Sequence, residues 1–193
     1  MGGTNAMIWN KKMECASRST MRKYQGEKLK DLVNSLWKNN PVYHQRLNHF
    51  SVKPSCIQNI HDIKRLPFTV KEDLRDNYPF GLFTDYENTA EIHVSSGTTG
   101  NPTVVGYTKD DLKLWSEVMA RSLALSGAMP GDLIQIAYGY GLFTGGLGFH
   151  YGALEMGLKV IPTSSGQTKR QLKLMNDFHP RILGCTPSYA LLS

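Results

Sequence analysis

The sequence has few cysteines, and none of them are spaced for a disulfide framework or a zinc site. Only three occur among the 193 residues, Cys15, Cys56 and Cys185, and no CxxC pair is present. An odd number of widely separated cysteines argues against both the cross-linked fold of a small secreted domain and a cysteine-based zinc site. We therefore expect a reducing, cytoplasmic location and no protein-bound metal.

The sequence also lacks an N-terminal apolar signal segment and an uninterrupted membrane-spanning run. The stretch 133–154 contains a single ionisable residue, His150, and is about as long as a bilayer requires. It nevertheless holds six glycines, three tyrosines, one glutamine and one threonine. This composition favours a buried strand, a glycine-rich loop and a buried helix, so we predict no membrane partner.

Acidic residues are outnumbered by basic ones. Lys and Arg total 22 against 16 Asp and Glu, which gives a net charge of +6, and many of the basic residues lie near the N-terminus. Apolar and acidic residues interrupt them, so a solvated helical face is favoured over nucleic-acid binding. The mild positive charge suits an anionic nucleotide or coenzyme equally well. With 40% hydrophobic and 20% charged residues, the chain can bury a core.

Two regions differ in texture, and we expect a helical N-terminal region over 1–90 and an incomplete α/β subdomain over 91–193. The first region is charged and poor in glycine. Its apolar spacing predicts helices over 26–39, ended by Pro41, and through Tyr43 to Leu47. Thr69 and Glu72 predict a capping box for a short helix over 70–76.

The second region alternates short apolar runs with amphipathic stretches, which predicts a mostly parallel, helix-flanked sheet. We expect strands over 91–94, 103–107, 133–137, 159–162 and 181–185, the first two forming a hairpin. We expect helices between Thr108 and Gly127 and over 147–156, 168–178 and 186–192. The predicted inward residues are Leu112, Trp115, Met119, Ser122 and Leu123 on the first of these helices, and Leu172 and Met175 on the third.

The most informative short segment is SSGTTGNPT at 95–103. Its two glycines allow a tight turn and a close backbone approach to a ligand. The four hydroxyls of residues 95–100 and free backbone N–H groups then form a concavity that suits a phosphate. The segment is neither a Walker A loop nor GxGxxG, because its glycines lie three apart and no Lys–Ser/Thr pair follows. The residues by themselves leave open an ordinary hydroxyl-rich hairpin turn.

With its flanks, this segment resembles the phosphate loop of the adenylate-forming superfamily, which includes acyl-CoA synthetases, luciferases and the adenylation domains of peptide synthetases. Further strings from about residue 40 onward resemble the phenylacetate–coenzyme A ligase family in the same order. These strings are LPFTVKEDLRDNYPFGLF, VVGYT, YGYGLFTGGLGFHYGALEMGLKVIPTSSGQTKRQ and CTPSY. The common pattern has Lys after the second glycine, where this chain has Asn101, so one cationic phosphate contact is missing.

The resemblance implies a two-step ligation of an aryl acid, using ATP, Mg²⁺ and coenzyme A. The carboxylate attacks the α-phosphorus of ATP to give an acyl-adenylate and pyrophosphate, and the thiol of coenzyme A then displaces AMP. The loop would hold the β- and γ-phosphates, and Thr98 or Thr99 would touch Mg²⁺. The implied phosphate-binding residues are Ser95, Ser96, Gly97, Thr98, Thr99, Gly100 and Thr103.

A second candidate site follows the expected strand 133–137. Ligands of open α/β sheets bind at the carboxyl ends of strands, and here glycines leave room while Tyr138 and Phe143 can contact an aryl group. From the residues alone, a packed aromatic corner of the core is the alternative. The resemblance places the arylacetate pocket here. The implied lining residues are Tyr138, Tyr140, Gly141, Phe143, Thr144, Gly145, Gly146, His150, Thr186 and Pro187.

Two of these residues have a structural interpretation beside the functional one. His150 on a buried helix is typical of a hydrogen-bonded core histidine, and it could also position the substrate carboxylate. Thr186 followed by Pro187 is typical of a helix start, and both residues could also line the crevice.

The resemblance further indicates an N-terminal portion only. Family members are considerably longer, and their adenine-contacting segments, ribose-binding aspartate and C-terminal domain with the catalytic lysine have no counterpart here. No catalytic residue is therefore assigned. We expect a truncated gene, a fragmented reading frame or a proteolytic product that is inactive by itself, and whose open sheet edge permits homo-oligomers.

Three functions stay open from the sequence. The first is a fragment of an arylacetate–coenzyme A ligase. The second is a non-catalytic module that binds a nucleotide or assembles with another chain. The third is an adenylating relative that acts on another aryl acid or a deazaflavin-type cofactor.

Overall fold

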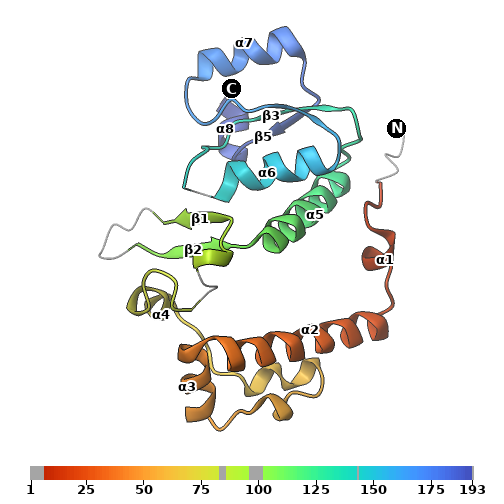
Figure 1. Cartoon of the computed structure of the whole chain (residues 1–193). Coiled ribbons are helices and arrows are strands. Elements are labelled where there is room, and N and C mark those ends of the chain that lie inside the picture. The colour runs from red at the N-terminus through yellow and green to blue at the C-terminus, as the bar shows by residue number, and fades with distance from the viewer. Residues whose placement is uncertain (1–6, 83–85, 96–101, 143, 193) are drawn as a thin grey trace. The chain divides into compact units, whose positions relative to one another are not determined.

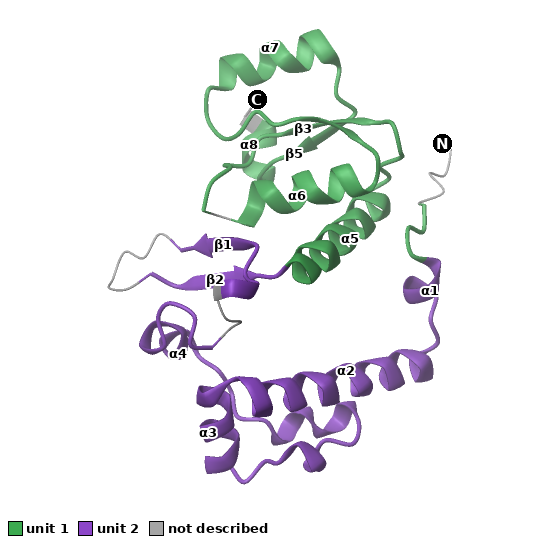
Figure 2. Ribbon diagram, viewed as in Figure 1, with its two compact units in different colours: residues 1–10, 109–193 green, residues 11–108 purple. Residues whose placement is uncertain are grey.

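The computed structural model describes residues 7–82, 86–95, 102–142 and 144–192 (Figure 1). The chain forms two compact units (Figure 2). One consists of residues 11–108, and the other consists of residues 1–10 together with residues 109–193. Their boundary lies at 108/109, since the hairpin 91–107 groups with the helical residues before it. The expected boundary at 90/91 stays a prediction for the domains of the whole protein.

The unit 11–108 is mostly helical. Its helices are α1 (Lys11–Glu14), α2 (Arg18–Asn39), α3 (Pro41–His49), α4 (Lys71–Asp76) and the 3-10 turns η1 (Pro54–Cys56), η2 (Ile60–Arg65) and η3 (Tyr86–Asn88). Its two strands are β1 (Glu91–Val94) and β2 (Val104–Tyr107). The core contains Leu29, Val33, Leu47, Val52 and Ile57. Apolar residues from α2 and α3 therefore pack against the loop that follows them.

Helix α2 begins eight positions before the expected start at residue 26. Its first two turns are polar, so no apolar period marks them, and Ser17 caps them by accepting a hydrogen bond from the Thr20 N–H at 3.1 Å. Pro41 follows the end of α2, as predicted, and also begins α3. Asn40 caps α3 by accepting from the Tyr43 N–H at 2.9 Å.

The predicted capping box at α4 is wrong in its residues. The helix begins one position later than expected, and the Asp73 carboxylate, not Glu72, accepts the reciprocal hydrogen bond, from the Val70 N–H at 2.8 Å. The Thr69 hydroxyl instead lies 3.2 Å from the Tyr43 hydroxyl. Asp73 also pairs with Arg46 at 2.8 Å. The Asp73 carboxylate therefore accepts from both the Val70 N–H and the Arg46 side chain.

The unit formed by 109–193 is a three-stranded parallel sheet between helices. Its elements are α5 (Lys109–Leu125), β3 (Leu133–Ile136), α6 (Thr144–Glu155), β4 (Lys159–Ile161), α7 (Thr168–Phe178), β5 (Ile182–Gly184) and α8 (Pro187–Leu192). The strand order is β4-β3-β5, and β3 pairs parallel with both neighbours. Figure 1 shows α7 on one side of the sheet and α6 with α5 on the other. The predicted fold class is confirmed.

Two glycines allow α5 and α6 to pack closely. A Cβ at Gly148 would lie 2.7 Å from Cζ2 of Trp115, and one at Gly152 would overlap Cβ of Met119 and lie 2.8 Å from its carbonyl carbon. Side chains of normal size at these positions would push the helices apart. Helix α6 therefore requires glycine on the face that meets α5.

The buried face of α5 differs slightly from the prediction. Leu123 is buried and Leu112, Trp115 and Met119 are partly buried, as expected. Ser122 is exposed, and its hydroxyl donates to the Val118 carbonyl at 3.2 Å. The alanines at 120 and 124 are fully buried in its place.

Helix α6 begins at Thr144, three residues before the expected start.

The inward face of α7 differs from the prediction at Leu172 but not at Met175. Leu172 is 40% exposed, whereas Gln171 is fully buried and faces the sheet, with Met175 partly buried. Gln171 meets Gln135 of β3, whose side chain is also fully buried. Ile134 and Ile136 belong to the apolar cluster with residues of α5 and α6. One face of β3 is therefore packed through buried amide groups, and the other through apolar side chains.

None of the helices within the described ranges is both long and apolar enough to cross a membrane.

Candidate functional site

The topology of the parallel sheet marks one edge at which a ligand crevice is expected. The chain passes from β3 to β4 on one side and then to β5 on the other side of β3. The strand order therefore reverses between β3 and β5, and open α/β sheets bind ligands outside the carboxyl ends of such strands. The loops that leave those ends carry Tyr138, Tyr140 and Gly141 after β3, and Thr186 and Pro187 after β5. The fold brings these predicted residues to one edge.

Tyr138 follows β3 and packs partly against the core of this unit. Its ring stacks on Phe149 of α6, with 5.4 Å between centroids and 10° between planes. Both rings are partly buried against the core cluster of this unit. The packed aromatic corner offered as the alternative interpretation is therefore present, and it fixes the orientation of the tyrosine that heads the loop.

Tyr140 and His150 form the polar pair of the site. The Tyr140 hydroxyl lies 3.2 Å from Nδ1 of His150, and the two rings meet edge to face at 5.8 Å. Burial raises the pKa of Tyr140 to about 12. The phenol is therefore neutral near pH 7 and can donate a hydrogen bond. His150 is both a hydrogen-bonded partner and the residue that orients Tyr140.

The first turn of α6 closes the loop after β3. Thr144, Gly145 and Gly146 form this turn, and a Cβ at Gly146 would lie only 2.7 Å from the Gly139 carbonyl oxygen. Glycine is therefore required where the helix meets the loop. Helix N-termini carry partial positive charge and free N–H groups, which favour an anionic ligand group. Phe143, also predicted here, lies outside the described residues.

The residues after β5 begin a helix, as one of their two interpretations predicted. Pro187 is the first residue of α8, and the Thr186 carbonyl accepts from the N–H groups of Tyr189 and Ala190 at 3.0 and 3.2 Å. Both Thr186 and Pro187 are exposed. They lie at the crevice edge and are open to a ligand.

The candidate phosphate loop joins the strands of a hairpin in the other unit. Strands β1 and β2 pair antiparallel, as predicted, and Ser95 with Thr103 closes the pairing beyond them. The Ser95 N–H donates to the Thr103 carbonyl and the Thr103 N–H donates to Ser95 Oγ, both at 2.9 Å. Ser96, Gly97, Thr98, Thr99 and Gly100 lie outside the described residues. Among those described, Thr103 Oγ1 is buried and has no hydrogen-bond partner.

The loop between β4 and α7 also faces this edge, although its residues were not among those predicted for the site. Ser164 Oγ accepts a hydrogen bond from the Tyr140 N–H at 3.3 Å. A Cβ at Gly139 would lie 3.4 Å from Ser165 Oγ. A glutamine between two isoleucines in the run 133–136 indicates a buried polar contact, because polar residues are rare on buried strands, but it does not identify the partner of that contact.

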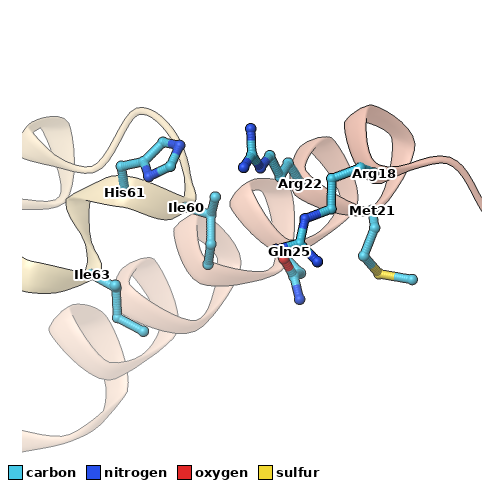
Figure 3. Close-up of a pocket in the computed structure, with 7 residues that line it drawn as sticks. All are labelled: Arg18, Met21, Arg22, Gln25, Ile60, His61 and Ile63. Atoms are coloured by element: carbon cyan, nitrogen blue, oxygen red, sulfur yellow. The ribbon is translucent and has the colours of Figure 1, made fainter.

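Two cavities open elsewhere. One, of about 410 Å³, lies between α2 and η2 and has Arg18, Arg22 and His61 among its lining residues (Figure 3). It contains none of the predicted site residues. The other, of about 390 Å³, runs along β5 and includes Phe149 and Cys185. Phe149 thus joins this cavity to the Tyr138 stack.

Comparisons with known proteins relate most of the chain to one group of enzymes. No protein-family model matches the sequence. Phenylacetate-coenzyme A ligases match it from Thermus thermophilus (51% identity over 185 residues, 95% of this chain and 42% of the relative), Aromatoleum evansii (50% over 180 residues, 93% and 41%) and Escherichia coli (47% over 189 residues, 96% and 43%). The chain spans less than half the length of the curated relatives it matches.

Solved structures match over the whole chain. A 2-hydroxyisobutyryl-CoA ligase with 2-HIB-AMP and CoA, in its thioesterification state, aligns with a TM-score of 0.89 at 24% identity, covering 44% of that structure. The open conformation of that ligase gives the same TM-score and covers 46%.

The fold is thus that of an adenylate-forming CoA ligase. Within that class, the sequence identities relate the chain to the phenylacetate–coenzyme A ligases, of which it corresponds to an N-terminal portion.

Proposed function

We propose that the chain supplies the N-terminal portion of an ATP-dependent arylacetate–coenzyme A ligase, with phenylacetate as the acid. The observation that carries this proposal is 47–51% identity to four phenylacetate-coenzyme A ligases along 93–96% of the chain. A match over at least 180 of the 193 residues leaves room for neither the segment 95–103 nor the loop after β3 to fall outside it. The chain alone is expected to be inactive, because it spans only 41–43% of the length of these relatives.

The proposed reaction has two displacements. A carboxylate oxygen of the arylacetate attacks the α-phosphorus of ATP, and the bond to the bridging oxygen of pyrophosphate breaks. The thiol sulfur of coenzyme A then attacks the acyl carbonyl carbon, AMP leaves, and the thiol proton passes to solvent. Both steps depend on positioning and on neutralising phosphate charge.

The crevice residues would hold the acid. Tyr138, fixed by its stack on Phe149, provides an aromatic edge for an aryl ring. Tyr140 is neutral near pH 7 and would donate to a carboxylate oxygen while its own oxygen accepts from Nδ1–H of His150. The first turn of α6 adds partial positive charge at the same edge.

The nucleotide and coenzyme assignments are likewise proposals. The predicted residues 95–100 and Thr103 would bind the β- and γ-phosphates of ATP, and the buried Thr103 hydroxyl is an available donor. Mg²⁺ would neutralise the phosphates. The described part of the chain has no group of three His, Cys, Asp or Glu side chains that could hold a metal ion. As the resemblance implies, the hydroxyl of Thr98 or Thr99 would touch Mg²⁺.

A chimera tests the proposal. The chain is fused to the C-terminal portion of the Thermus thermophilus relative, at the end of the matched region, and phenylacetate-dependent exchange of pyrophosphate into ATP is measured. We expect exchange, and a loss of about tenfold or more for Gly100→Ala, which restricts the loop backbone. The relative's own halves, rejoined at the same junction, control for folding. A folded chimera that exchanges with no aryl acid contradicts the proposal.

Other expectations for the whole protein stay predictions. These are a cytoplasmic location, homo-oligomers through an open sheet edge, and the absence of nucleic-acid and membrane partners. All three cysteines are free, with Cys15 exposed and Cys56 and Cys185 partly buried.

A further inference from the structure

The loop between β4 and α7 has an unusual backbone. Ser164, Gly166 and Gln167 have positive φ values of 65°, 78° and 50°. Left-handed backbone is unfavourable for residues with a Cβ, and it persists only where the surroundings enforce it. Such residues concentrate at ligand-binding segments. Something must therefore hold this loop at the crevice edge.

The side-chain amide of Gln171 holds it. Nε2 donates to the Ser164 carbonyl at 2.6 Å and lies 3.4 Å from the Gly166 carbonyl, while Oε1 accepts from Nε2 of Gln135 at 2.7 Å. Both glutamine side chains are fully buried. A methionine at 171 would fill a similar space but could bind neither carbonyl. The two buried amides between α7 and β3 therefore make hydrogen bonds that an apolar pair could not make, and these bonds hold the loop after β4.

The held loop in turn holds Tyr140. The Ser164 N–H and the Thr163 hydroxyl both donate to the Ile136 carbonyl, at 3.1 and 2.8 Å, which ties the loop to the end of β3. Ser164 Oγ then accepts from the Tyr140 N–H at 3.3 Å. A continuous set of hydrogen bonds thus joins the interior of α7 to the backbone of the crevice tyrosine.

We propose that Gln171 is a positioning residue that fixes Tyr140 at the mouth of the acid-binding crevice, acting through Ser164. The link to an aryl acid rests on the proposed function, whereas the positioning of Tyr140 does not. Gln171 itself touches no substrate. Its contribution is the orientation of a residue that does.

Hydrogen exchange of the Tyr140 amide in the 193-residue chain tests the positioning. We expect Gln171→Met to raise its exchange rate about tenfold relative to amides in α5, since one retained hydrogen bond corresponds to roughly that factor. Ser164→Ala removes the acceptor directly, leaves the core intact and should give a similar increase. Leu174→Ala, a partly buried change on the same helix whose side chain makes no hydrogen bond, is the matched control.

Two results would overturn the positioning role: an unchanged Tyr140 rate in Ser164→Ala, or equal rates in Gln171→Met and Leu174→Ala. If Gln171→Met does not fold, Gln171→Leu replaces it. Leucine is neutral and can donate to neither carbonyl, so it should also expose the Tyr140 amide.

Kinetics of the chimera test the link to the acid. In Gln171→Met we expect the KM for phenylacetate to rise about tenfold while the KM for ATP is unchanged, because only the acid would contact Tyr140. Equal changes in both KM values would overturn the link. If the Tyr140 amide shows the expected increases in hydrogen exchange while the chimera has no ligase activity, that pair of results would refute the proposed function and leave the positioning role standing.

Discussion

Replacing Gly152 by alanine should loosen the contact between α5 and α6. The new methyl group would overlap Cβ of Met119 and lie 2.8 Å from its carbonyl carbon and 3.0 Å from the Ala120 nitrogen. Overpacking of this kind costs up to about 3 kcal/mol, because backbone atoms cannot turn away. The better helix propensity of alanine returns about 1 kcal/mol. The free energy of unfolding should therefore fall by about 2 kcal/mol.

Urea denaturation followed by circular dichroism measures this change. Gly148→Ala on the same helix makes an informative comparison, since its methyl group would meet ring atoms of Trp115, the nearest at 2.7 Å. Trp115→Ala should relieve most of the cost of Gly148→Ala, whereas Met119→Ala should not relieve Gly152→Ala. Glu155→Ala, exposed at the end of α6, controls for propensity alone. A Gly152→Ala protein as stable as the wild type would refute the argument from close packing.

Three further predictions concern charge and backbone. Because burial raises the pKa of Tyr140 to about 12, this tyrosine ionises at lower pH in the unfolded chain than in the folded one. The free energy of unfolding should therefore fall as pH rises above about 10. In a titration followed by tyrosinate absorbance, Tyr140→Phe should remove the step at the highest pH. The pKa of Asp73 is lowered by the Val70 N–H and then by Arg46, so its stabilisation should be lost as pH falls below the usual 3.8, and Asp73→Asn should remove that acid dependence in NMR-monitored unfolding. Gly166→Ala meets no atoms within 4 Å but has a φ of 78°, so calorimetry should show a loss of about 1–2 kcal/mol from backbone strain alone, and no loss would contradict that φ value.

The order and type of the elements could be predicted from the sequence because apolar period and turn residues carry them. All five strands and the helices of the α/β part lie close to their expected ranges. Positions set by polar side chains were harder. The start of α2 depends on Ser17 in a stretch with no apolar pattern, and the α4 cap uses Asp73 because that carboxylate also meets Arg46.

The candidate site was predictable in part for the same reason. Residues that follow parallel strands can be assigned to one sheet edge from topology, as with Tyr138 and Thr186. The buried Gln135–Gln171 pair was not predictable, because a helical spacing rule favours Leu172 as the inward residue. Tertiary hydrogen bonds overrode hydrophobic period at that point.

The strand order has a consequence for the sequence of folding events. The middle strand β3 is synthesised before both of its neighbours, and its pairing with β5, Ile134 beside Ile182, spans more than half of the segment 109–193. Contacts of such long range form slowly, whereas α5 and α6 can meet through their glycines soon after they emerge. The helical layer should therefore mature first, and the crevice edge between β3 and β5 should be the last part of the unit to be assembled.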